Sequence, residues 1–175
     1  MTAHADRLEA AVRARGLDLL LVTELVNVRW ATGFTGSNGL AVIGPDTRTF
    51  VTDFRYLSQS AEEVPDFRRE IASADLLAGA LKTLPPGREL RVGYDHASMS
   101  VKTFDHLREL AGAPIELVPA GGLVEELRAV KDPDEIERIR AAAQLADAAL
   151  EVVLKRGLAG RTEREVALDL EVEQR

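Results

Sequence analysis

The 175-residue sequence contains no cysteine. This absence excludes a disulfide framework, thiolate metal sites and a cysteine nucleophile. Histidine is scarce too, since only His4, His96 and His106 are present and no two of them stand three or four positions apart. Neighbours on one helix face need that spacing, so the histidines form no local pair of metal ligands. We therefore expect no resident metal ion within this chain.

A surplus of positive charge and long apolar runs are also missing. The chain has 22 Lys and Arg against 29 Asp and Glu, a net charge of -7, which disfavours a nucleic-acid partner. No apolar stretch approaches the roughly 20 residues that a membrane span needs. The first ten residues lack the apolar core of a signal peptide. We expect a cytoplasmic protein with no nucleic-acid or membrane partner.

The residues that are present alternate between strand and helix patterns. Short apolar runs predict strands over residues 17–23, 39–43, 47–53, 67–72, 90–95 and 115–119. Helical patterns are found near Leu8 and over residues 56–63, 75–83 and 100–110. The turn residues of Gly44 to Thr47 join the second and third strands as a hairpin. This order indicates an α/β domain around a mixed β-sheet flanked by helices.

Two capped helices are expected after this domain. Asp132 and Glu135 form a capping box around Pro133, and Thr162 and Glu165 form another. The first helix carries a stripe at alternating steps of three and four, made of Ile136, Ile139, Ala143, Ala146, Leu150 and Val153. Two helices cannot bury such a stripe by themselves. Either they pack on the first domain or they begin a second domain that is truncated here, and we expect the second.

The segment T-G-F-T-G-S-N-G, residues 32–39, is the most distinctive stretch. A dinucleotide loop would need G-x-G-x-x-G before a helix, but a strand pattern follows here. A P-loop needs a lysine, and a nucleophile elbow needs G-x-S-x-G; both are missing. The glycines therefore favour a close-packed turn into a core strand. Downstream, Asp53 and Arg55 fit a strand-end ion pair or helix cap at least as well as a ligand site.

Several stretches, taken in order, resemble one family. They are N-V-R-W-A-T-G-F-T-G-S-N-G, V-T-D-F-R-Y-L-S-Q-S-A-E-E, V-G-Y-D-H-A-S-M-S, L-V-E-E-L-R-A-V-K-D-P-D-E-I-E-R-I-R and G-R-T-E-R-E-V-A. Together they are similar to the Xaa-Pro peptidases, the group of aminopeptidase P, prolidase and creatinase. The resemblance implies cleavage of the bond that precedes proline. Two divalent metal ions, usually manganese or cobalt, activate a bridging water in such enzymes.

The same resemblance implies two parts for this chain. Residues 1–124 correspond to the creatinase/prolidase-like N-terminal domain, and residues 125–175 to a linker and the first helices of the catalytic domain. The family's metal ligands and catalytic histidines belong downstream of Arg175, so none can be assigned here. This implies that the 175-residue chain alone is inactive.

The resemblance also implies a homodimer or larger homo-oligomer that acts on proline-containing peptides. In such assemblies the N-terminal domain helps to close a neighbouring subunit's substrate pocket. Candidate substrate contacts in trans are Phe34, Ser37, Asn38 and Arg55. An arginine suits a peptide carboxylate because its guanidinium can bind in a bidentate way. A non-catalytic peptide- or protein-binding module and a creatinase-like C–N hydrolase remain the alternatives.

Overall fold

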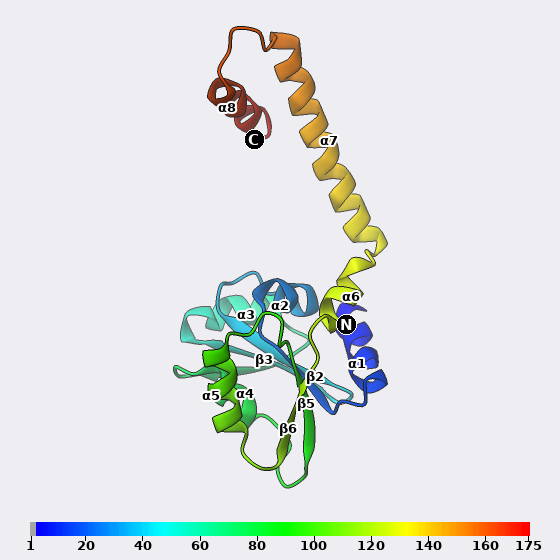
Figure 1. The fold of residues 1–175 in the computed structure, drawn as a ribbon, viewed down its shortest axis with the longest axis vertical. Coiled ribbons are helices and arrows are strands. Elements are labelled where there is room, and N and C mark those ends of the chain that lie inside the picture. Colours follow the sequence, from blue (N-terminus) through cyan, green and yellow to red (C-terminus); the bar gives the residue numbers. More distant parts are fainter. Residues whose placement is uncertain (1–2) are drawn as a thin grey trace. The chain divides into compact units, whose positions relative to one another are not determined.

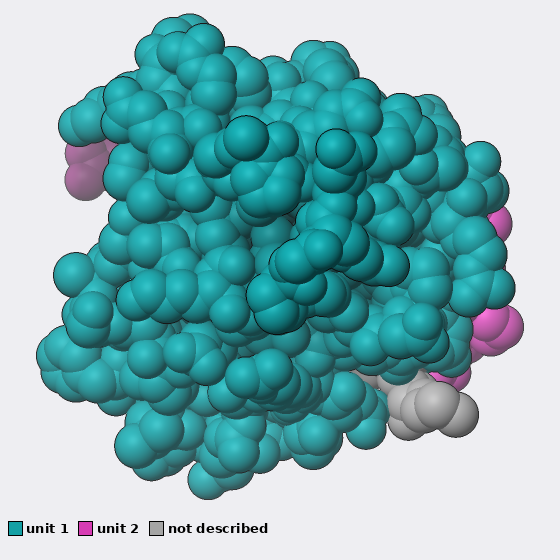
Figure 2. All heavy atoms as spheres, turned by 90° about the horizontal axis from the view of Figure 1, so that it is seen from below, with its two compact units in different colours: residues 1–129 teal, residues 130–175 magenta. Residues whose placement is uncertain are grey.

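The computed structural model describes residues 3–175 of the chain. They divide into two compact units, the first ending at Ala129 and the second covering residues 130–175 (Figure 2). The first unit ends with the helix α6 (Leu123–Ala129). The boundary expected from the sequence, at Val124, falls inside this helix.

Within the described residues, the first unit is built on one six-stranded sheet (Figure 1). The strands are β1 (Leu19–Val22), β2 (Gly39–Gly44), β3 (Thr47–Asp53), β4 (Arg68–Ala72), β5 (Leu90–Tyr94) and β6 (Ile115–Pro119). Their order across the sheet is β4-β3-β2-β1-β5-β6. Strand β2 runs antiparallel to both of its neighbours, and the other pairs are parallel. The expected mixed sheet and hairpin are confirmed.

Helices cover both faces of the sheet. One face packs against α1 (Ala3–Ala14), α2 (Leu25–Thr32) and α6, and the other against α4 (Leu76–Lys82) and α5 (Val101–Ala111). Side chains alternate along β1, so Leu20 and Val22 join the first core while Leu19 and Leu21 join the second. Every residue of β1 and β2 is buried. This explains why both strands read as continuous apolar runs.

The helix α2 was not expected from the sequence. Its N-cap residue, Glu24, makes no side-chain capping hydrogen bond, and β-branched residues weaken its helical pattern. Tertiary packing supports it instead, because Asn27, Val28 and Ala31 are buried. The Asn27 amide also donates to Glu125 and accepts from Arg128 of α6. These contacts hold α2 in place between the sheet and α6.

The second unit consists of α7 (Pro133–Arg156) and α8 (Glu163–Glu173). Both expected capping boxes are present, and Gly157 ends α7 with a φ of 84°. Val153 is buried at the end of α7 that contacts α8, and Arg156 forms an ion pair with Asp169 at 3.2 Å. The other large side chains of the stripe are exposed: Ile136, Ile139 and Leu150. Among residues 3–175, no helix is both long and apolar enough to cross a membrane.

Candidate functional site

The glycine-rich loop and the end of β3 meet at one edge of the sheet. The loop links α2 to β2, while β3 runs back beside β2 and ends at Asp53. Gly39 is paired with Thr52 in the β2–β3 register, which brings Asn38 next to Asp53. The Thr52 hydroxyl donates to the backbone oxygen of Asn38 at 2.6 Å. The register of the hairpin therefore assembles the site.

The glycine-rich loop begins at a residue with a left-handed backbone conformation. Gly33 ends α2 with a φ of 86°, a left-handed conformation that favours glycine, and its N–H donates to the Arg29 carbonyl oxygen at 2.8 Å. The Thr32 hydroxyl then accepts from the N–H of Phe34 at 3.1 Å. These bonds direct the chain out of the helix into the loop.

The next two glycines allow aromatic rings to approach the backbone. A Cβ atom at Gly36 would lie 2.3 Å from the Phe34 ring and 2.8 Å from the Tyr56 ring. One at Gly39 would lie 2.7 Å from the Phe50 ring. Such distances are too short for any side chain. The interpretation of the segment as a close-packed turn is confirmed.

Phe34 lies in the core beneath the loop. Its side chain is 1 % exposed, and its ring contacts Phe50 at 4.6 Å and Tyr56 at 5.4 Å between centroids. Tilted and edge-on contacts of this kind are the preferred arrangements of aromatic rings. Phe34 therefore supports the loop from within this chain.

Asp53 connects the loop to Arg55. Its carboxylate accepts from Nε of Arg55 at 2.9 Å, from Nη2 at 2.7 Å and from the backbone N–H of Arg55 at 2.9 Å. The Asn38 side-chain amide donates to the same carboxylate. Arg55 and then Asn38 hold the pKa of Asp53 well below its usual range. Both structural interpretations of the pair are confirmed, because Asp53 caps the 3-10 turn η1 (Phe54–Tyr56) and also forms an ion pair.

We predict that Asp53→Asn changes the acid sensitivity of the fold. The pKa of Asp53 is lower in the folded than in the unfolded chain, where it is about 3.9. The stability that it supplies is therefore complete above that value and is lost as the pH falls through the folded pKa. Urea unfolding between about pH 7 and 2 should show a smaller acid-induced loss in Asp53→Asn than in the natural chain. Asp46 is exposed and its side chain makes no hydrogen bond or ion pair among residues 3–175, so Asp46→Asn is the control substitution. Parallel curves for all three proteins would contradict the prediction.

The rim of the loop is held by two further polar clusters. Ser37 Oγ lies 2.7 Å from the Tyr56 hydroxyl. Glu63, at the end of α3 (Leu57–Glu63), accepts from the Thr35 N–H and hydroxyl, each at 2.7 Å. The Thr35 N–H and then its hydroxyl lower the pKa of Glu63. Ser37 thus bonds to a phenol and not to a strong base, so this arrangement suits binding better than acid–base catalysis.

Arg55 and Phe54 are large, outward-facing side chains of this cluster. The Arg55 side chain is 58 % exposed, and its Nη1 makes no hydrogen bond within residues 3–175. Phe54 is 73 % exposed and was not singled out from the sequence. The feature of the sequence that could have identified Phe54 is its place between Asp53 and Arg55, directly after a buried strand. Together the two side chains offer a cationic and an apolar contact.

The histidines lie in separate environments. His4 Nδ1 lies 2.9 Å from the Trp30 carbonyl oxygen, His96 Nδ1 accepts from the Gly121 N–H at 3.1 Å, and His106 Nε2 lies 2.6 Å from Asp75. In these bonds each histidine has a different partner. The glycine loop with Asp53 and Arg55 is therefore the main candidate site.

Comparison with known proteins identifies the class of this domain. Residues 5–130 match the model of the Creatinase/Prolidase N-terminal domain. The chain belongs to this family. A curated relative, the "Uncharacterized peptidase YqhT" of Bacillus subtilis (strain 168), is 37% identical over 156 residues, which are 89% of this chain and 44% of the relative.

Solved structures agree with this assignment. An Xaa-Pro dipeptidase from Bacillus anthracis matches with a TM-score of 0.88 and 29% identity, over 98% of this chain and 48% of that one. The N-terminal domain of a putative metallopeptidase from Corynebacterium diphtheriae matches with a TM-score of 0.62 and 35% identity, over 69% of this chain and 98% of that one. The chain thus spans about half the length of the longer relatives.

Proposed function

We propose that this chain is the N-terminal part of a metal-dependent Xaa-Pro peptidase, either an aminopeptidase or a dipeptidase. The observation that carries the proposal is the family match over residues 5–130, together with relatives that are peptidases. The chain covers 44% and 48% of two of these relatives. We infer that the catalytic residues and two divalent metal ions, manganese or cobalt, belong to a part of the protein outside these 175 residues. In this proposal the chain alone is inactive.

The proposed role of the domain is to close the substrate pocket of a neighbouring subunit in a homodimer or larger assembly. Arg55 binds the carboxylate of a short peptide substrate. Its Nη1 can donate to this carboxylate while Nε and Nη2 keep their hydrogen bonds to Asp53. Ser37 and Asn38 form the polar rim, and Phe34 supports them from the core. Asp53 keeps the guanidinium oriented, which lowers the entropic cost of binding.

Arg55→Gln in the full-length protein tests this role. We expect the KM for an Xaa-Pro peptide to rise by about tenfold with little change in kcat, because a charge-assisted hydrogen bond is lost and the chemistry is not touched. Steady-state hydrolysis with added manganese or cobalt measures both constants. Arg55→Lys should recover part of the loss. Arg108→Gln removes an arginine of similar exposure from an Asp105 ion pair on α5 and is the matched control.

Two results would contradict the proposal. A full-length protein that hydrolyses no Xaa-Pro bond with either metal would remove the proposed activity. An Arg55→Gln enzyme with an unchanged KM would remove the substrate role of Arg55 while leaving the peptidase assignment in place.

A further inference from the structure

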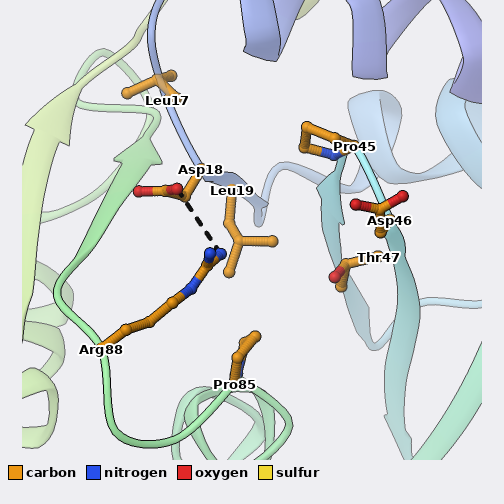
Figure 3. A pocket seen from close by; sticks show the side chains of 8 residues that line it. All are labelled: Leu17, Asp18, Leu19, Pro45, Asp46, Thr47, Pro85 and Arg88. Carbon is orange, nitrogen blue, oxygen red and sulfur yellow. Dashed lines mark ion pairs between the residues drawn. The ribbon is translucent and has the colours of Figure 1, made fainter.

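A cavity lies at the opposite end of strand β2 from the glycine loop. It has a volume of about 520 Å³. The start of β1, the β2–β3 turn and the loop before β5 surround it (Figure 3). It is lined by Leu17, Asp18, Leu19, Pro45, Asp46, Thr47, Pro85 and Arg88. Strand β2 runs from the glycine loop to this cavity. Its six residues place the two sites about 17 Å apart along the strand.

The lining combines apolar and charged side chains. Leu17 and Leu19 are buried, and Pro45 and Pro85 add apolar surface on two sides of the cavity. Figure 3 shows Arg88 reaching toward Asp18 from the loop that carries Pro85. The accessible surface of the cavity is divided about equally between polar and apolar atoms. Its volume lies within the usual range of small-ligand sites.

Arg88 is only loosely held. Its Nη2 lies 3.6 Å from Asp18 Oδ1, and its side chain is 58 % exposed. Asp18 also accepts the backbone N–H of Arg91 at 2.8 Å through Oδ2. A ligand that took the Arg88 guanidinium would therefore leave Asp18 with a hydrogen-bond partner. The cost of freeing Arg88 is small, because exposed ion pairs contribute little to stability.

The other side of the cavity offers unused polar groups. Asp46 stands at the β2–β3 turn, and Thr47 begins β3 (Figure 3). Neither side chain makes a hydrogen bond or ion pair in the part of the chain that the structure describes. A free carboxylate thus lies on one side of the cavity and an available guanidinium on the other.

We propose that this cavity binds a short zwitterionic peptide with apolar side chains. The peptide carboxylate pairs with Arg88, its ammonium group pairs with Asp46, and its side chains contact the leucine and proline wall. The lining carries two carboxylates, Asp18 and Asp46, and one guanidinium, Arg88. A ligand with both charges pairs with Arg88 at one end and with Asp46 at the other, whereas a simple anion would face Asp46 without a compensating charge. This binding does not depend on the proposed peptidase activity, because it uses none of the residues at the glycine loop.

The test is a titration of the ¹⁵N-labelled 175-residue chain with leucyl-leucine, followed by NMR. We expect saturable shifts at Asp46, Thr47 and Arg88, and unchanged signals from residues 33–38. Arg88→Gln and Asp46→Asn should each weaken binding by about tenfold, since each removes one charge-assisted contact. N-acetyl-leucyl-leucine amide lacks both charges and should not bind measurably.

Arg108→Gln is again the matched control, and it should bind leucyl-leucine like the natural chain. Unchanged chemical shifts far from the cavity check that each variant is folded. The proposal is overturned if no saturable shift is seen up to about 10 mM peptide. It is also overturned if both cavity variants bind as the natural chain does, or if only the glycine loop responds.

Discussion

Replacing Phe34 by alanine should lower the free energy of unfolding of the sheet unit by about 3–5 kcal/mol. The ring is 1 % exposed and contacts both Phe50 and Tyr56, so its removal leaves a cavity beneath the glycine loop. The loop cannot collapse into this space freely, because its glycines already pack against the same rings. Urea denaturation followed by circular dichroism measures the loss.

Phe54→Ala is the matched control for this substitution. This variant also removes a phenylalanine ring, but the Phe54 side chain is 73 % exposed. The free energy of unfolding should therefore change by no more than about 0.5 kcal/mol. Equal losses in the two variants would contradict the placement of Phe34 in the core. They would also weaken our interpretation of the loop as a turn supported from beneath.

The second large effect concerns self-association through α7. We expect the chain to form a dimer or larger assembly in which the stripe of residues 136–153 takes part. Ile136, Ile139 and Leu150 are 44 %, 55 % and 44 % exposed, and soluble monomers rarely leave an extended apolar surface uncovered. Ile139→Asp combined with Leu150→Asp should shift the assembly toward monomer while the sheet unit stays folded. Sedimentation at micromolar concentration measures the change.

Leu145→Asp supplies the control on the same helix. Leu145 is 51 % exposed, but at about 100° per residue it lies on a different face from Ile139 and Leu150. This variant should associate as the natural chain does. A natural chain that sediments as a clean monomer would refute the prediction before any substitution is made, and equal effects of all the variants would remove the role of the stripe.

The elements that the sequence determined by itself are those that depend on local interactions. The capping boxes at Asp132 and Thr162 involve residues three positions apart, so their spacing alone predicts the helix starts. The apolar runs of β1 and β2 and the turn between β2 and β3 are local in the same sense. The pairing of Asp53 with Arg55, two residues away, also belongs here.

The tertiary structure decided the contacts between segments that are distant in the sequence. Helix α2 has no cap of its own and depends on the buried contacts of Asn27 with α6, about 100 residues later. The bond from Asn38 to Asp53 exists because the β2–β3 register places Gly39 opposite Thr52. The cavity lined by Leu17, Asp46 and Arg88 requires three chain segments to meet at one end of the strands. Such contacts arise only when strands pair and helices pack, so residue spacing along the chain carries no direct signal for them.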